Sequence, residues 1–378
     1  MIFFYKHSFL KYFCFILSSV CLFGFTLISC SGTPKKYNGL GLATDNAPLA
    51  ENALCGTLKN GMRYYILENH RPRDGDGIAL LTLAVNAGSG NEREKEKGYA
   101  DFVKKVILKS TAKYKNANFE GFYLDSGLSS EIPAYAETSL EHTVFQFTVS
   151  TGTDENGIKT VPQAMLSMLN QLCSTGYFDS TVVNDVRSKT LEEIAESENA
   201  YKSVADRMRL QLIYKGCPLS EHVNILGTTQ SIETIRPVDA ERFYRNWYRP
   251  DNMALIFTGD FDAANLLDYL ENNFNAPAGR KPFDRVVNEL PVPQKNSTEI
   301  EIFKDKDIED INGFLYYKLA PSTRVKSDIA EFRLSLIDSI ILGTMTERFK
   351  NTFEDAPLKE LQYYRELIGK SSGYFVIR

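Results

Sequence analysis

A buried strand that leads through a short loop toward a charged segment is the feature that most constrains how this chain folds. Residues 78–85 are apolar at nearly every position, which is typical of a buried strand. Some residues later, the segment 98–111 is predicted to be a helix. Asp101 and Lys105 lie four positions apart there, on one face of a helix, and are predicted to form an ion pair.

The other periodic segments predict an α+β domain. Residues 57–67 contain an Asn60-Gly61 turn between two strand-like runs, and 143–150 alternate between apolar and polar side chains as a half-buried strand does. Helices are predicted over 161–173, 180–198 and 205–214, and a short amphipathic segment over 119–124. This mixture indicates an antiparallel sheet with helices packed on one face.

A further helix, turn and strand are predicted between residues 238 and 261. Asp239 is expected to cap the helix, Pro250 to prevent its continuation, and 253–257 to form a buried strand. Residues 276–297 include several prolines and are predicted to be a linker. A second strand and helix pattern follows, with a strand within 314–319 and a helix over 328–342.

The N-terminus has the pattern of an export signal. Residues 1–29 combine a positive start with an apolar run. The sequence 27–30 resembles the lipobox of bacterial lipoproteins, in which the cysteine, here Cys30, is lipidated and becomes the new N-terminus after the signal is cleaved off. The alternative is an uncleaved membrane anchor, because the run is marginally long enough to span a bilayer. Residues 30–50 are predicted to be a tether without a packed core. No acidic run follows Cys30, so the periplasmic side of an outer membrane is the expected location.

Composition excludes some classes of function. The net charge of −5 leaves no basic stripe and does not support binding to nucleic acid. After cleavage, Cys55, Cys173 and Cys217 remain besides Cys30, with spacings that match no zinc motif. The remaining histidines are His70, His142 and His222. His142 directly precedes the predicted strand 143–150 and is therefore not expected to be part of a zinc helix, and the other two are expected to be surface residues and not metal ligands.

The predicted helix at 98–111 resembles the zinc helix of the M16 family of insulinase, pitrilysin and processing peptidases. In that family two histidines one helical turn apart hold zinc, and a glutamate beside the second activates water. Asp101 stands at the position of the first histidine, Lys104 at the glutamate and Lys105 at the second histidine. A protonated lysine has no lone pair for a metal, so the resemblance implies a degenerate site.

Two other segments carry the same resemblance. The run 189–194 places Glu193 at the family's third zinc ligand, with Glu192 as the alternative if the register shifts by one residue. The string 227–261 resembles the closing section of an M16 domain, where a Gly-Thr loop precedes a helix and a strand ends in Gly-Asp-Phe. Asp101, Lys104, Lys105 and Glu193 are expected either to form a charge cluster or to leave both lysines facing solvent.

The resemblance implies the fold and the range of functions. It implies the α+β LuxS-like metallohydrolase fold of M16 proteins, with a peptidase-like domain over 51–275 and a truncated second copy over 298–378. In the second copy, the helix is expected to end near Leu342, before a turn that contains Arg348. A lipoprotein without zinc or peptidase activity is expected, binding extended peptides or supporting an active M16 partner. The alternative is a zinc endopeptidase with a displaced site, or one that is active only with a competent partner chain.

Overall fold

The computed structural model describes residues 52–70, 77–111, 135–216, 218–274, 300–306, 312–318, 328–352, 362–368 and 372–378. The chain divides into two compact units. One comprises 1–47 and 326–334, and its described residues are 328–334. The other comprises 48–325 and 335–378 and contains all the remaining described elements. The predicted signal, Cys30 with the whole tether 30–50, the segment 119–124, Cys217 and the linker 276–297 lie outside the described residues.

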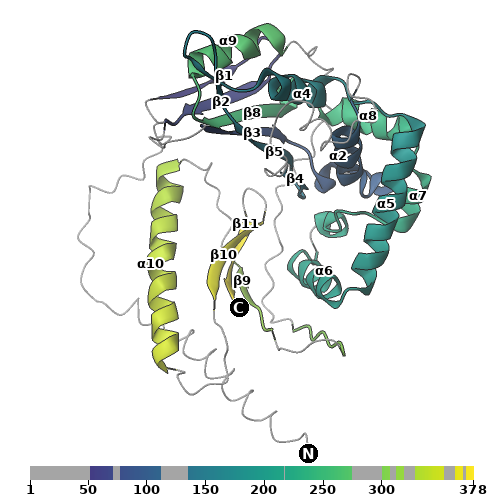
Figure 1. Cartoon of the computed structure of the whole chain (residues 1–378). Helices are drawn as coiled ribbons and strands as arrows, with labels where there is room; N and C mark the ends of the chain where they lie inside the picture. Colours follow the sequence, from purple (N-terminus) through teal and green to yellow (C-terminus); the bar gives the residue numbers. More distant parts are fainter. Residues whose placement is uncertain are drawn as a thin grey trace, which may run out of the picture. The chain divides into compact units, whose positions relative to one another are not determined.

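A six-stranded sheet forms the centre of the larger unit (Figure 1). Its spatial order is β1-β2-β8-β3-β5-β4. The strands are β1 Ala53–Thr57, β2 Arg63–Glu68, β3 Ile78–Val85, β4 Tyr135–Thr138, β5 Thr143–Ser150 and β8 Met253–Gly259. The predicted buried strand and the predicted alternating strand are both confirmed, with the expected bounds.

The prediction of an antiparallel sheet is wrong for one pair. β2 pairs with β8 in parallel, whereas the other neighbours in this sheet are antiparallel. The reason is topological, because β8 inserts between β2 and β3, which run in opposite directions. A strand placed between two such strands must be parallel to one of them, and periodicity along the sequence carries no information about that insertion.

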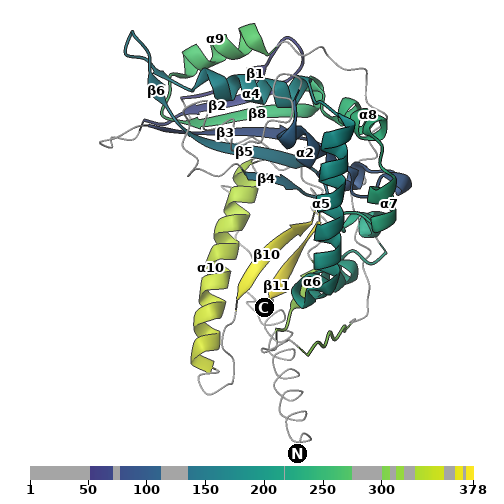
Figure 2. The same ribbon diagram turned by 45° about the vertical axis from the view of Figure 1, so that its right-hand side comes forward.

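One face of the sheet is buried and carries helices. Along β3 and β5, buried and half-buried residues alternate, as expected for a strand with one face in the core. The helices α2 Tyr99–Lys109, α4 Gln163–Ser174 and α9 Ala263–Asn273 contribute side chains to the same core. In Figure 2, α4 and α9 lie along one side of the sheet. The largest fully buried side chains include Phe102, Phe145, Phe147, Phe257 and Phe261.

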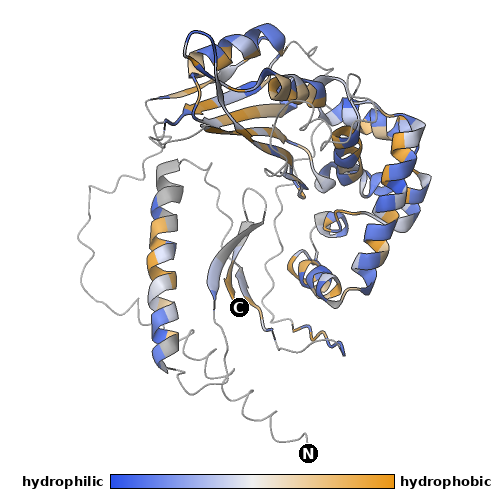
Figure 3. Cartoon of the chain, viewed as in Figure 1, coloured by the Kyte–Doolittle hydropathy of each residue, from blue (hydrophilic) through white to orange (hydrophobic). Residues whose placement is uncertain are grey.

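The remaining helices of this domain are α5 Ser180–Asn199, α6 Tyr201–Ile213, α7 Thr229–Thr234 and α8 Pro237–Trp247. Figure 3 shows that α5 is mostly hydrophilic, whereas the sheet strands carry much of the apolar colour. A small hairpin, β6 Gly152–Thr153 with β7 Lys159–Thr160, follows β5. Asp239 does not cap α8 as predicted. The N-cap is Arg236, and Asp239 lies in the first turn, where its carboxylate pairs with arginines.

The C-terminal part holds β9 Leu315–Lys318, α10 Asp328–Thr352, β10 Tyr363–Ile368 and β11 Ser372–Ile377. These strands form an antiparallel sheet in the order β10-β11-β9. The expected helix end near Leu342 is wrong, because α10 continues to Thr352. The hydroxyls of Thr344 and Thr346 donate to the carbonyls of Ile340 and Leu342, so the threonines are accommodated within the helix. No helix within the described ranges is long and apolar enough to cross a membrane.

Candidate functional site: the charged face of helix α2

Helix α2 starts at a fixed point because its first N–H groups are satisfied by a buried carboxylate. The two Glu92 oxygens accept hydrogen bonds from the backbone N–H groups of Gly98 and Ala100, each at 2.8 Å. Glu92 is 6% exposed. Gly98, the N-cap, has a φ of 89°, a conformation that suits glycine. This cap sets where the charged residues of the next turn fall.

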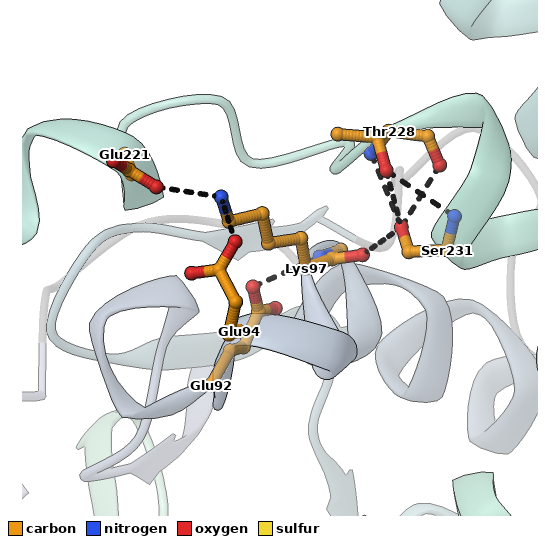
Figure 4. Close-up of polar contacts among 7 residues, drawn as sticks. Glu92, Glu94, Lys97, Glu221, Thr228 and Ser231 are labelled. Atoms are coloured by element: carbon orange, nitrogen blue, oxygen red, sulfur yellow. Dashed lines mark hydrogen bonds and ion pairs between the residues drawn. The ribbon is translucent and has the colours of Figure 1, made fainter.

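A second loop closes tightly against this start (Figure 4). A Cβ on Gly98 would lie 2.4 Å from the Leu226 carbonyl oxygen, and one on Gly227 would lie 2.3 Å from that of Lys97. The Ser231 hydroxyl donates to the Lys97 carbonyl at 2.5 Å. The Lys97 ammonium contacts Glu94 and Glu221, each at 2.8 Å. We call this set of contacts around Gly98 and Gly227 the glycine clasp.

One helical turn further on, three charged side chains meet. The Lys104 Nζ lies 2.5 Å from the Asp101 Oδ1, and the Lys105 Nζ lies 2.9 Å from the Asp101 Oδ2. The predicted ion pair of Asp101 with Lys105 is therefore confirmed. Lys104 does not face solvent: the residue is 9% exposed and Asp101 is 4% exposed.

Glu193 completes this arrangement from a different helix. Its carboxylate, on α5, lies 2.5 Å from the Lys105 Nζ. Of the two residues that the sequence left open, Glu192 and Glu193, the structure brings Glu193 to α2 through this contact. Lys105 thus bridges the carboxylates of Asp101 and Glu193 and links the two helices. We call Asp101, Lys104, Lys105 and Glu193 the ion-pair cluster.

The electrostatics of the cluster fix its protonation. Burial acts to raise the pKa of Asp101, but the two nearby ammonium groups outweigh it and hold that pKa below its usual value. Burial acts to lower the pKa of Lys105, and the carboxylates of Asp101 and Glu193 outweigh it, so the pKa lies above its usual value. Near neutral pH the aspartate is therefore ionised and the lysine protonated.

This donor set does not fit zinc. A structural or catalytic zinc site in proteins uses thiolates, neutral imidazoles and carboxylates, and a protonated lysine offers no lone pair. Both oxygens of Asp101 are already in contact with ammonium groups. Across the parts of the chain that the structure describes, no group of three or more His, Cys, Asp or Glu side chains could hold a metal ion.

The histidines of the described chain lie apart from the cluster. His70 is exposed, as predicted, and its ring contacts Glu68 and the Asp260 carboxylate, the latter at 2.6 Å. His222 is partly exposed, in agreement with a surface position, and its backbone carbonyl accepts from the buried Ser89 hydroxyl at 2.7 Å. Cys55 and Cys173 are both free thiols, exposed and buried respectively.

The edge strand β4 lies beside the charged helix. Within the described ranges β4 pairs with β5 alone, and it contacts α2. Tyr135 and Glu137 are exposed on this strand, whereas Thr138 is buried. An edge strand has backbone N–H and C=O groups on its open side, which can pair with another extended chain.

Sequence reasoning missed the residues that hold the start of α2. These residues are Glu92, in the loop before α2, and Ser231, within the string 227–261. The signal that could have found the clasp is the pair of glycines, one before each helix, because positive φ values recur at such positions (89° at Gly98, 79° at Gly227). Sequence alone does not show that the two loops touch.

Comparison with known families gives two matches. The description "Insulinase (Peptidase family M16)" matches residues 70–225. The description "Peptidase M16 inactive domain" matches residues 234–357. The first match contains the ion-pair cluster and β4, and the second begins at the end of α7.

Individual relatives point the same way. The chain is 25% identical over 348 residues to the "Probable zinc protease PqqL" of Escherichia coli, covering 92% of this chain and 35% of the relative. It is 26% identical to the Arabidopsis thaliana "Zinc protease PQQL-like", covering 78% and 29%. The chain therefore spans about a third of the length of these relatives. The crystal structure of the first half of the periplasmic protease PqqL from Escherichia coli matches with a TM-score of 0.72 at 23% identity, over 88% of this chain and 69% of that one.

Proposed function

The chain belongs to the insulinase family of peptidases, M16, and from this premise we propose that it binds peptides or supports a partner chain without zinc or peptidase activity of its own. The observation that carries this proposal is the ion-pair cluster. Asp101, Lys104 and Lys105 stand at the family's His, Glu and His positions and are engaged with one another and with Glu193. A buried lysine at the position of the base cannot activate water as a carboxylate does.

The cluster also supplies a structural role for the retained Glu193. In a zinc-bearing M16 domain the metal would join the helix of the two histidines to the helix of the third ligand. Here Lys105 makes that connection between α2 and α5, with a carboxylate of each helix in contact. We propose that these ion pairs replace the metal as the link between the two helices, which keeps the surface beside β4 in place.

Peptide binding is proposed to occur at β4. An extended peptide can add to the open side of an edge strand through backbone hydrogen bonds, largely without regard to sequence. The exposed side chains of Tyr135 and Glu137 would then contact alternate residues of the peptide. The partner-supporting version of the proposal uses the same edge, with an active M16 homologue presenting the substrate.

Zinc content tests the proposal directly. We expect the wild-type protein to retain far less than stoichiometric zinc after zinc loading, with no cleavage of unfolded peptides. The triple variant D101H/K104E/K105H restores the family's residues and is expected to bind zinc. Adding E193Q to that variant is the matched control, because it removes the third ligand and should weaken binding sharply. Stoichiometric zinc in the wild-type protein would overturn the proposal.

A second candidate function is favoured by the length of the relatives. Two of them are named as zinc proteases, and this chain spans about a third of their length. A zinc endopeptidase active only after assembly with a competent chain is therefore the alternative. Peptide cleavage by a complex of this chain with an M16 homologue that carries His-x-x-Glu-His distinguishes the two. Cleavage above that of the homologue alone would show that this chain supports its partner. If a zinc-ligand variant of the homologue abolishes that cleavage and E193Q in this chain does not, this chain supplies no zinc chemistry of its own.

The proposed location is the periplasmic side of an outer membrane, with the chain anchored through lipidated Cys30. One relative is described as periplasmic, which supports the compartment. A single acyl chain anchors weakly, so the several chains of a bacterial lipoprotein are required. The variant C30A is expected to move from the membrane fraction to the soluble fraction on cell fractionation. An unchanged membrane fraction would favour an uncleaved anchor.

A further inference from the structure

A basic cavity lies at the start of α8, away from the contacts of the ion-pair cluster. Its volume is about 460 Å³, and it is bordered by the segment 93–96, the first residue of α2, the last residue of α7 and the first turn of α8. Four of its lining residues are cationic, namely Arg93, Lys95, Arg236 and Arg242, and three are acidic, namely Glu94, Glu96 and Asp239. The lining therefore carries a formal charge of +1, four positive less three negative.

A nearly buried aspartate holds two of the arginines in place. The Asp239 side chain is 10% exposed, and its Oδ2 accepts from the Arg236 Nε at 2.7 Å. Its Oδ1 accepts from the Arg236 Nη2 at 3.2 Å and contacts the Arg242 Nη2 at 2.9 Å. The Arg236 and Arg242 side chains are 70% and 50% exposed. The Arg242 Nη2 also lies 4.0 Å from the Glu96 carboxylate. Each guanidinium has five N–H donors, more than these carboxylate contacts use, so donors remain for a ligand.

The other acidic groups of the lining have partners as well. The Glu94 carboxylate contacts Lys97 at 2.8 Å, and the Glu96 carboxylate accepts from the backbone N–H of Arg93 at 3.2 Å. Tyr99 is 5% exposed and lines the cavity. The cavity thus combines exposed cationic groups with one buried aromatic wall.

We propose that this cavity binds the carboxylate of an acidic side chain in a peptide. Arg236 and Arg242 converge on the same aspartate, and each guanidinium is a planar fork of the kind that binds a carboxylate. The volume exceeds what one carboxylate needs and leaves room for the rest of a residue. Three acidic groups in the lining disfavour the doubly charged phosphate relative to a singly charged carboxylate.

This inference does not rest on the function proposed above. The cavity residues belong to 93–99, the end of α7 and α8, whereas the proposed peptide edge is β4 and the cluster joins α2 to α5. Substitutions at Arg236 and Arg242 leave β4 and the cluster unchanged, so the two proposals can fail separately.

Fluorescence anisotropy with a labelled glutamate-rich peptide tests the proposal on the full chain. We expect this peptide to bind roughly tenfold more tightly than its glutamine counterpart, and R236Q and R242Q each to weaken its binding by about tenfold. The variant R236K keeps the charge and loses the fork, and is expected to weaken binding by a smaller factor. The matched control is R245Q, on the same helix and 74% exposed, where Arg245 pairs with Glu241 outside the cavity.

The outcomes separate cleanly. Loss of binding in R236Q and R242Q, with R245Q unchanged and all variants melting at the wild-type temperature, supports the proposal. Equal binding of the glutamine peptide, or an equal effect of R245Q, overturns it in favour of diffuse charge attraction. Displacement of the peptide by inorganic phosphate at comparable concentration also overturns it, because the site would then recognise phosphate and not a carboxylate.

Discussion

The first two turns of α2 are held in place by opposite kinds of chemistry. The start of the helix is fixed by the glycine clasp and by backbone N–H groups that donate to Glu92. The next turn is fixed by side-chain charges, in the ion-pair cluster. The first region depends on the absence of a Cβ at two positions. The second depends on charge balance, which several residue combinations can satisfy.

This difference teaches which part of the helix tolerates change. A clash with a backbone carbonyl cannot be relieved by choosing another rotamer, so the clasp permits almost no substitution. A charge cluster can be rebuilt with other residues of suitable sign and size. The scaffold of an M16 helix can therefore persist while the residues that would hold zinc are exchanged.

The largest effect is expected from breaking the clasp. The variant G98A places a Cβ 2.4 Å from the Leu226 carbonyl oxygen at a φ of 89°. We expect the free energy of unfolding to fall by at least about 4 kcal/mol, measured by urea denaturation. The control is G157A, where φ is 81° and no atom lies within 4 Å, so only backbone strain of about 1 kcal/mol applies. Equal losses in the two variants would show that the close approach of the Leu226 carbonyl to Gly98 adds nothing beyond backbone strain.

Breaking the charge balance is expected to cost less. The variant D101N leaves the Lys104 and Lys105 ammonium groups without their shared carboxylate in a mostly buried setting. We expect a loss of about 3 kcal/mol in the free energy of unfolding. The control is D185N, because Asp185 pairs with Lys109 and Lys189 at a side chain that is 43% exposed, where such pairs contribute little. A D101N protein as stable as wild type would show that the cluster is not a structural link.

The two regions are expected to respond to pH in opposite directions. Burial raises the pKa of Glu92 above its usual value of 4.5, so its contribution to stability is lost as pH rises from about 4.5 through the folded-state pKa. The pKa of Asp101 lies below its usual 3.8, so its contribution is present above that pH and lost as pH falls through the folded-state pKa.

Unfolding measured across pH checks this contrast. Relative to wild type, the E92Q variant should lack the fall in the free energy of unfolding as pH rises above about 4.5. The D101N variant should lack the fall as pH decreases below about 3.8. Each difference is expected to be on the order of 1 kcal/mol. Parallel pH profiles for the wild type and E92Q would show that backbone N–H donors keep Glu92 ionised in spite of its burial.

The smallest effect is expected at the link between helices. The variant E193Q removes one partner of Lys105, but the Glu193 side chain is 45% exposed and Asp101 remains in contact. We expect a loss below about 1 kcal/mol, shrinking further at high salt. The neighbouring E192Q is the control, with no expected change. A large loss of stability in E193Q would show that the Lys105–Glu193 pair is the main link between α2 and α5.

Local sequence patterns predicted much of the fold, whereas features that depend on contacts between distant segments could not be predicted. The bounds of β3 and β5 follow from side-chain periodicity, which acts within one strand. The helix predicted over 180–198 is observed as α5 at Ser180–Asn199 for the same reason. The parallel pairing of β2 with β8 depends on topology. Asp239 does not cap because α8 already begins at Pro237, so its carboxylate pairs instead with Arg236 and Arg242, three residues away on either side.

The candidate site divides in the same way. The ion pair of Asp101 with Lys105 follows from helical spacing alone. Whether Lys104 is buried, and whether Glu192 or Glu193 reaches α2, depend on the packing of α5 against α2, which no local pattern encodes. Glu92 lies six residues before Gly98, so its hydrogen bond with the Gly98 N–H depends on the path of the loop between them, which the sequence does not show.

The insertion of β8 between β2 and β3 also determines the order in which this domain can fold. β3 is complete at Val85, but its partner on one side comes from residues 253–259. During synthesis, the edge of β3 that faces β8 therefore stays without that partner until the chain has grown by more than a hundred residues. Such non-local pairing slows folding and leaves an apolar strand edge open to other chains. The central sheet is therefore complete only once residues 253–259 have been added to the chain.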